Sequence, residues 1–201
     1  MPVLTGAERA VGRVPGSDPY PWPYDGDLEP ARMALVVAGA SSAWRSRCPD
    51  LAIAERNIGL LSGAMRSAGA VVVTVHQGVP ARAGFFGEEG EPLVLRGARR
   101  VHAAGLDAFY GGPLEPALRA LGRDLLVLAG YGLEGPVHST LRGANDRGLE
   151  CLLVTDACTS TDQGLRDAAA RTVTMSGGIF GAVGDTASVC AALEARKDAL
   201  R

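Results

Sequence analysis

Runs of apolar residues recur along this chain and alternate with amphipathic stretches. Continuous apolar runs are typical of parallel strands that are buried on both faces, and they predict strands at 33–38, 70–75, 124–129, 151–154 and 172–175. Apolar residues at helical spacing, together with capping and stop signals, predict helices at about 51–68, 113–121, 136–147, 162–170 and 185–196. This alternation favours a three-layer α/β/α fold with a parallel sheet of about six strands.

The first 30 residues have a different pattern. They are rich in proline, glycine and charge, so we expect an extended N-terminal arm at 1–30, followed by a single domain at 31–201. Tyr20, Trp22 and Tyr24 alternate with prolines in this arm. Leaving three aromatic side chains in water would waste apolar area, so we expect the arm around Trp22 to pack on a neighbour, which favours a homo-oligomer.

Two loops stand out. Residues 77–113 form a predicted long loop that contains a short apolar piece at 92–95, and long loops in compact domains are usually functional or interfacial. Residues 177–181 are rich in glycine but lack the Lys-Ser/Thr pair of a phosphate-binding loop. We interpret this second loop as an ordered segment that packs on a neighbour.

Composition excludes several classes of function. The net charge is -2 and the chain has no basic block, which argues against nucleic acid and membrane partners. No apolar run approaches the ~20 residues that span a bilayer, and no signal peptide is recognisable, so we expect a cytoplasmic protein. The 4 cysteines have no metal-type spacing, so we expect them to be reduced thiols that bind no metal. We also expect no cofactor.

The most informative segment is 130–140, between an apolar run and a predicted helix. This is a strand, a tight turn and a helix N-terminus, where backbone amides and a helix dipole face a ligand in α/β proteins. Pro136 stands where we expect the first helical residue. Proline offers neither a reactive side chain nor an N–H at that position.

Residues 130–140 resemble the signature Gly-Val-Ala-Thr-Asp-x-Cys-Val-x-x-Thr of the isochorismatase-like cysteine hydrolases, and 142–148 and 154–158 fit its continuation. Residues 18–26 look like the N-terminal arm of the biuret and ureidoacrylate amidohydrolase branch, and 177–181 resemble its C-terminal loop. The resemblance covers about residues 18 to 195. It implies the same fold and a hydrolase ancestry.

The enzymes of this family use an Asp, a Lys and a Cys. The resemblance places these positions at Gly39, Ala103 and Pro136, and a shift of one residue would place the Lys position at His102 instead. All three catalytic types are replaced in this alignment. The chain has one lysine, Lys197, near its C-terminus, and arginine cannot take the place of a lysine that must release a proton near neutral pH.

The pocket is expected where the carboxyl ends of the parallel strands meet. The predicted ligand-binding residues at that edge are Ser41, Trp44, His102, Phe109, Tyr131 and Gly132. The resemblance also implies a strained cis peptide bond between Tyr131 and Gly132.

Other chemical groups lie near the strand ends. A relocated site could use Cys158, His102 or Asp156, although Cys158 also fits a small packed residue and His102 a surface histidine. His76 follows Thr74-Val75 rather than the Asp-x of the metal-binding relatives, so we expect no metal there. His138 is interpreted as structural. Asp50 and Asp107 are the acids nearest to the lost Asp position at Gly39, but each belongs to a different part of the sequence pattern.

Three hypotheses for function remain open. The first is a catalytically degenerate family member that acts as a binding or assembly subunit, either as a homo-oligomer or together with an active amidohydrolase relative. The second is a hydrolase of C–N bonds in small amides or ureas that uses a relocated site. The third is a sensor that keeps the pocket and binds a small molecule.

Overall fold

The sheet is organised around its first strand. The computed structural model describes residues 12–49, 51–77 and 91–199. In it, β1 (Met33–Ala38) pairs with β2 (Val71–Gln77) on one side and β4 (Leu125–Tyr131) on the other. Beyond these lie β3 (Arg99–Ala103) next to β2, then β5 (Glu150–Thr159) and β6 (Ala182–Gly184) next to β4. All pairings in this six-stranded sheet are parallel, as predicted, and the order β3-β2-β1-β4-β5-β6 changes direction between β1 and β4.

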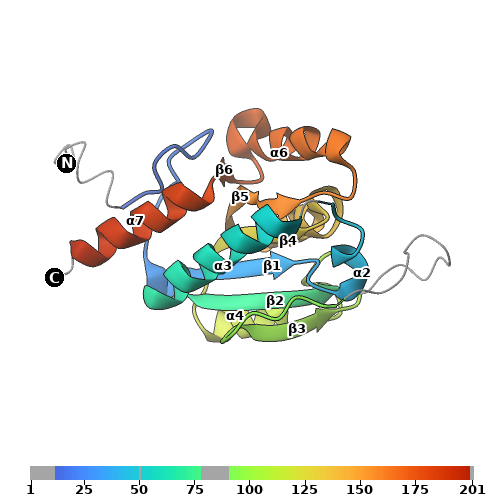
Figure 1. Ribbon diagram of the computed structural model, residues 1–201. Helices are drawn as coiled ribbons and strands as arrows, with labels where there is room; N and C mark the ends of the chain where they lie inside the picture. The colour runs from blue at the N-terminus through green and yellow to red at the C-terminus, as the bar shows by residue number, and fades with distance from the viewer. Residues whose placement is uncertain (1–11, 50, 78–90, 200–201) are drawn as a thin grey trace.

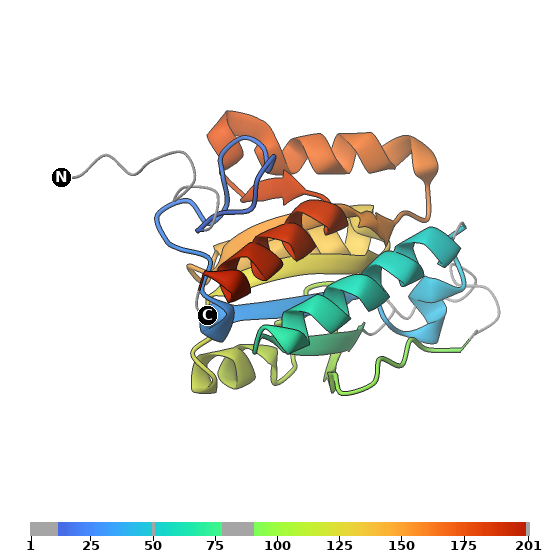
Figure 2. The ribbon, with the colours of Figure 1, turned by 60° about the vertical axis from the view of Figure 1, so that its left-hand side comes forward.

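Helices cover both faces of the sheet (Figure 1). The helices α3 (Leu51–Ser67) and α7 (Thr186–Asp198) lie side by side on one face (Figure 2), while α4 (Leu114–Ala120) and α5 (His138–Asn145) cover the other. Side chains alternate along a strand, so Leu35 packs toward α3 and Val36 toward α5. Each face therefore has its own apolar cluster, which confirms the predicted three-layer fold.

The prediction of a strand at 172–175 is wrong. These residues belong to α6 (Gln163–Gly178), which has a break at Met175–Gly177. Ala169 and Val173 are the buried residues of α6, and their spacing of four is that of a helix face. Because Val173 lies between threonines, local β propensity favoured a strand, but burial of the helical face decided the outcome. The last strand is instead the short edge strand β6.

The predicted loop at 77–113 contains a strand that the sequence pattern did not reveal. Strand β3 begins with the exposed residues Arg99 and Arg100, so it lacks the apolar run of a buried strand. Charged side chains are common on edge strands, because they discourage pairing with other chains. In the predicted apolar piece at 92–95, the Leu93 N–H donates to the Ala40 carbonyl at 3.0 Å, and the Leu95 carbonyl accepts from the Ala98 N–H at 3.2 Å.

The described part of the N-terminal arm packs on its own domain. Val14 forms an antiparallel bridge with Trp22, and Asp18 forms another with Val183 of β6. Trp22 is fully buried, whereas Tyr24 is 62% exposed. Gly178, in the predicted neighbour-packing loop, lies against Pro19 and Tyr20 of the arm. The arm and this loop therefore cover one another within one chain, and η1 (Pro30–Arg32) connects the arm to β1.

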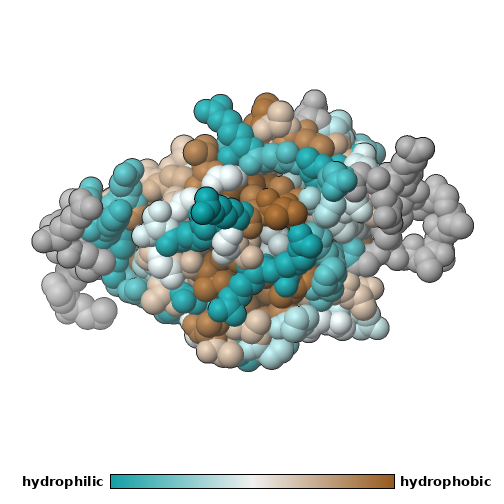
Figure 3. Space-filling view, turned by 60° about the horizontal axis from the view of Figure 1, so that its bottom comes forward, coloured by the Kyte–Doolittle hydropathy of each residue, from teal (hydrophilic) through white to brown (hydrophobic). Residues whose placement is uncertain are grey.

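The surface on the side of α4 and β3 is mixed in character. Figure 3 shows hydrophilic side chains lying between patches of apolar surface on this face. Beside α4, Arg147 lies over the Phe109 ring at 4.7 Å and pairs with Glu115 at 2.8 Å. Among the described residues, no helix has the length and apolar character needed to cross a membrane.

Candidate functional site

The carboxyl ends of β1 and β4 meet at the point where the strand order changes direction, which is the usual ligand site of a parallel α/β sheet. Gly39 follows β1 with a φ of +67°, and a Cβ atom there would lie 2.3 Å from the Tyr131 carbonyl oxygen. No real Cβ tolerates that contact. The predicted Asp position therefore has neither the backbone conformation nor the space for a side chain unless the backbone moves.

Gln77 occupies the space between the three predicted triad positions. Its side chain is buried, its Oε1 accepts a hydrogen bond from the Gly39 N–H, and its Nε2 donates to the Leu106 carbonyl. The same Nε2 lies 3.2 Å from Thr140 Oγ1 and 3.4 Å from the Pro136 carbonyl oxygen. One carboxamide thus links the end of β1, the segment after β3 and the turn after β4.

The predicted Lys position lies beside this carboxamide. Ala103 is the register partner of Gln77 on the neighbouring strand, so the two side chains leave the sheet on the same face. Ala103 is buried in the cluster on the α5 side. The structure therefore brings Gly39, Ala103 and Pro136 together around Gln77. Sequence reasoning missed Gln77 because the predicted strand ended at residue 75, two residues too early.

Pro136 does not open a helix as predicted. It lies inside the π-helix η2 (Leu133–Val137), and α5 begins only at His138. The Pro136 carbonyl accepts a hydrogen bond of 2.7 Å from Thr140 Oγ1, which is four residues later. The ring of Trp44 lies over the start of this turn, 2.9 Å from where a Cβ on Gly132 would be.

The predicted cis bond between Tyr131 and Gly132 is wrong. In the described residues the cis peptide bonds are Asp18-Pro19 and Trp22-Pro23. Gly132 instead has a φ of 69° and a ψ of 64°, in the left-handed region. That conformation, which glycine adopts easily, turns the chain from β4 into η2 with a trans peptide bond.

The predicted ligand-binding residues are only partly brought together. Trp44 and Gly132 are in contact. The Tyr131 side chain packs on the α3 side of the sheet, in the same apolar cluster as Trp44, and its hydroxyl donates to Glu55 Oε1 at 3.2 Å. Burial, and then the nearby Glu55, raise the pKa of Tyr131. Phe109 packs on the α5 side.

Ser41 lies at the start of the short helix α2 (Ser42–Arg45) and makes no capping bond. Its buried Oγ has no hydrogen-bond partner among the residues that the structure describes.

His102 is on the far face of β3 from Ala103. It is exposed, and its ring lies 5.5 Å from the ring of His76, its register partner on β2. His76 is 8% exposed, and burial, together with Arg100 and His102, lowers its pKa to about 4. No group of three or more His, Cys, Asp or Glu side chains able to hold a metal ion occurs within the described ranges.

The groups of the hypothetical relocated site are separated. Cys158 and Asp156 of β5 line one cavity of about 420 Å³, but His102 is on β3. Four strand spacings of about 4.8 Å separate β3 from β5, which is roughly 19 Å. Cys158 is 1% exposed, and burial raises its pKa to about 12, so the sulfur is a neutral thiol rather than a nucleophilic thiolate.

Asp50 and Asp107 are the two acids predicted to be nearest to the lost Asp position. Asp107 accepts a hydrogen bond from the Phe109 N–H at 2.9 Å and pairs with Arg147 at 3.7 Å. Asp50 lies outside the described residues. His138, interpreted as structural, is the first residue of α5, and burial lowers its pKa.

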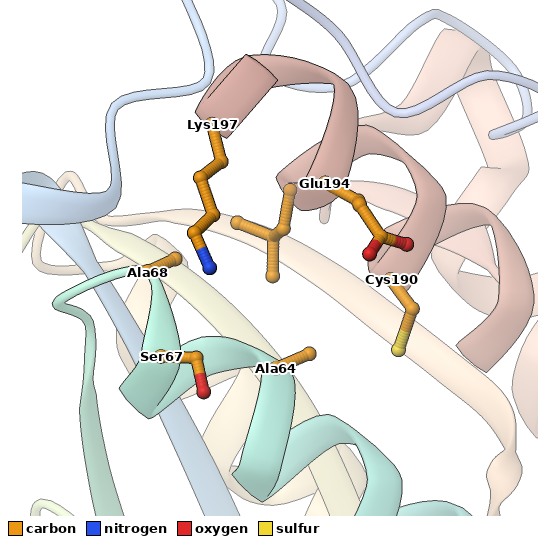
Figure 4. Close-up of a pocket in the computed structure, with 7 residues that line it drawn as sticks. Ala64, Ser67, Ala68, Cys190, Glu194 and Lys197 are labelled. Carbon is orange, nitrogen blue, oxygen red and sulfur yellow. The ribbon is translucent and has the colours of Figure 1, made fainter. Parts of the chain in front are cut away.

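The single lysine lies far from these positions. Lys197 is near the end of α7, where it lines a small cavity with Ser67, the last residue of α3, and with Ala68, which follows it (Figure 4). The end of α3 precedes the first residue of β2, so this cavity is at the amino edge of the sheet. Gly39 and Pro136 are at the carboxyl edge, about seven strand residues or roughly 20 Å away.

Comparison with known proteins agrees with the architecture. The sequence model of the isochorismatase domain matches residues 33–188. A cysteine hydrolase from Pseudomonas syringae pv. phaseolicola 1448A is similar in structure, with a TM-score of 0.72, 17% identity and coverage of 84% of this chain and 95% of that chain. An isochorismatase from Pseudomonas putida KT2440 gives a TM-score of 0.66 at 22% identity, covering 80% of this chain and 91% of that chain.

A further similar structure is an isochorismatase-like hydrolase from Alkaliphilus metalliredigens, with a TM-score of 0.69, 17% identity and coverage of 83% of this chain and 98% of that chain. At these identities the structural likeness shows the fold. The match of the domain model extends from the first residue of β1 into α7, and so includes every strand of the sheet. The chain therefore belongs to the isochorismatase domain family.

Proposed function

We propose that this protein is a catalytically degenerate member of its family, which acts as a binding or assembly subunit instead of an Asp-Lys-Cys hydrolase. The observation that carries this proposal is the position of Gln77. Its carboxamide is hydrogen-bonded to Gly39 and lies within 3.4 Å of the Pro136 carbonyl. A buried amide with partners at both ends is a stable structural element, and it offers no nucleophile and no base at neutral pH.

The turn after β4 supports the same proposal. In the cysteine enzymes this turn supplies the thiol and an amide that stabilises the oxyanion. Pro136 provides neither, and its own carbonyl is used by Thr140. Loss of one oxyanion donor alone costs roughly 10²–10³ in rate. Loss of nucleophile, base and lysine together leaves little of the family reaction.

An assembly role implies a partner, and we propose a homo-oligomer or a complex with an active amidohydrolase relative. Met175 and Ile179 support this, because both are about half exposed near the break in α6. Trp22 no longer supports it, since its own chain buries it completely. Light scattering at micromolar concentration tests the homo-oligomer, and co-purification from the native cell tests the complex.

The alternative is a hydrolase of C–N bonds that uses a relocated site. Cys158 and Asp156 do line one cavity, which is the observation in its favour. Against it, the thiol is neutral, and both oxygens of the Asp156 carboxylate accept hydrogen bonds from Thr186 and Asn57. No histidine that could act as the base lines this cavity.

Assays on biuret, ureidoacrylate, nicotinamide and isochorismate distinguish the two proposals. We expect no turnover above the buffer background with the wild-type protein. We also expect none with Pro136→Cys, because the base and the lysine remain absent. If the wild-type protein shows turnover and Cys158→Ala abolishes it, the proposal of a catalytically degenerate protein is rejected in favour of the relocated site. Turnover gained by Pro136→Cys alone would contradict the proposed role of Gln77 and Gly39.

A further inference from the structure

The cavity that Asp156 and Cys158 line lies at the carboxyl end of β5, between the start of α3 and the start of α6. Its volume is about 420 Å³, within the range of small-molecule sites. The residues that line it are Ala52, Ile53, Ala54, Asp156, Cys158, Gln163 and Arg166. None of them is among the triad positions or bonded to Gln77, so this cavity is formed by other residues than those around Gln77.

Two opposite charges line this cavity without neutralising each other. Arg166 comes from the first turn of α6, and Asp156 comes from β5. Among the described residues, six other pairs of an arginine and a carboxylate lie within 4.0 Å of each other, but Arg166 and Asp156 do not form such a pair. A ligand that carries both charges would satisfy both groups at once.

Each of these charges is held in place by the protein. Asp156 Oδ1 accepts from the Thr186 N–H and hydroxyl, both at 2.9 Å, and Oδ2 accepts from Asn57 Nδ2 at 3.1 Å. Arg166 Nη2 donates to the Thr155 carbonyl at 2.7 Å. That bond uses one of five N–H donors of the guanidinium, which leaves donors for a carboxylate. Such preorganisation reduces the entropy cost of binding.

The rest of the cavity is neutral or apolar. The Cys158 thiol is buried and uncharged, and Ala52, Ile53 and Ala54 contribute apolar surface. These three residues also belong to the first turn of the long helix α3, whose N–H groups and dipole favour a negative group nearby. The setting is therefore suited to binding rather than to chemistry.

We propose that this cavity binds a small zwitterion of amino-acid size, with its carboxylate at Arg166 and its ammonium group at Asp156. The methylene groups between them lie against Ile53 and the alanines. This inference does not depend on whether the protein is an enzyme, because it uses none of the triad positions. A failed hydrolase assay and a failed binding experiment are therefore separate results.

Isothermal titration calorimetry tests the proposal with glycine, β-alanine and γ-aminobutyrate, which separate the two charges by increasing distances. Propionate and propylamine carry one charge each and serve as half probes. We expect saturable binding of at least one zwitterion below about 10 mM, and binding of each half probe at least about 10-fold weaker. No saturable binding of any zwitterion, or equal binding of a half probe, overturns the proposal.

Variants locate the binding. Arg166→Gln is expected to weaken binding of the best zwitterion at least about 10-fold, and Asp156→Asn to weaken it similarly while leaving propionate unaffected. Arg171→Gln is the matched control, since Arg171 is exposed on the same helix and does not line the cavity. If Arg166→Gln does not fold, Arg166→Lys keeps the charge and loses the bidentate geometry, and is expected to weaken binding several-fold. Unchanged binding in a folded Arg166 variant overturns the proposal.

Discussion

The side-chain oxygen of Gln77 accepts a hydrogen bond from the backbone N–H of Gly39 in the interior of the protein. The other end of the same carboxamide donates to the Leu106 carbonyl. These bonds connect the ends of β1 and β2 to the segment before α4 across the carboxyl edge of the sheet. The first of the following predictions depends on this connection.

Replacing Gln77 with leucine should destabilise the fold. The volume is similar, but the Gly39 N–H and the Leu106 carbonyl lose a buried partner, and each unsatisfied group costs about 1–3 kcal/mol. We expect a loss of at least about 2 kcal/mol in the free energy of unfolding, measured with urea. The other glutamine, the exposed Gln163, gives the control Gln163→Ala, which should stay within about 0.5 kcal/mol. Equal effects of the two variants would show that the buried network contributes nothing.

A pair of glycine variants separates backbone conformation from close contact. Gly39 and Gly122 have φ values of +67° and +63°, but a Cβ on Gly122 would meet no atom within 4 Å. Gly122→Ala should therefore cost only the left-handed conformation, about 1–2 kcal/mol. Gly39→Ala should cost at least about 2 kcal/mol more, because its Cβ would overlap the Tyr131 carbonyl. Thermal and urea unfolding of both variants measure the difference, and similar losses would mean that the two strand ends separate easily.

His76 should make the stability depend on pH. Its pKa in the folded protein is about 4, below the ordinary 6.5, because it is buried near Arg100 and His102. The unfolded chain therefore binds the proton more tightly, and stability that is present above pH 6.5 is lost as the pH falls toward about 4.

His76→Gln should reduce this loss, which is measured by urea unfolding at about pH 7 and about pH 5. His102→Gln serves as the comparison, because that side chain is exposed and should change the pH dependence less. An unchanged slope in His76→Gln would assign the pH dependence to other groups.

The arm should contribute to folding, contrary to the expectation that its aromatic residues serve mainly a partner. Trp22 is fully buried against its own domain, so Trp22→Ala should cost about 3–5 kcal/mol. Tyr24→Ala is the control, since Tyr24 is 62% exposed, and it should cost less than about 1 kcal/mol. Differential scanning calorimetry at several protein concentrations measures both. A small loss of stability in Trp22→Ala, or a loss that depends on protein concentration, would indicate that Trp22 acts between subunits instead.

Alternation of apolar runs and amphipathic stretches was enough to predict the parallel sheet and most of its helices. The clearest cases are α3, which begins at Leu51 as expected, and α7, whose predicted cap Asp185 accepts from the Ser188 N–H. These features are local, because a buried strand needs a continuous apolar run and a helix end needs a capping group. The strand β3 was not predicted, because an edge strand exposes half of its residues and need not be apolar.

The site depended more on tertiary structure. The sequence by itself determined that Pro136 has no thiol and that the only lysine is near the C-terminus, because these are matters of residue type. Only the fold decided that Gln77 lies between Gly39 and Pro136, that Tyr131 packs on the α3 side of the sheet, and that His102 is four strands from Cys158. The physical reason is that contacts between strand ends depend on register and strand order, and the local apolar pattern of a parallel strand determines neither.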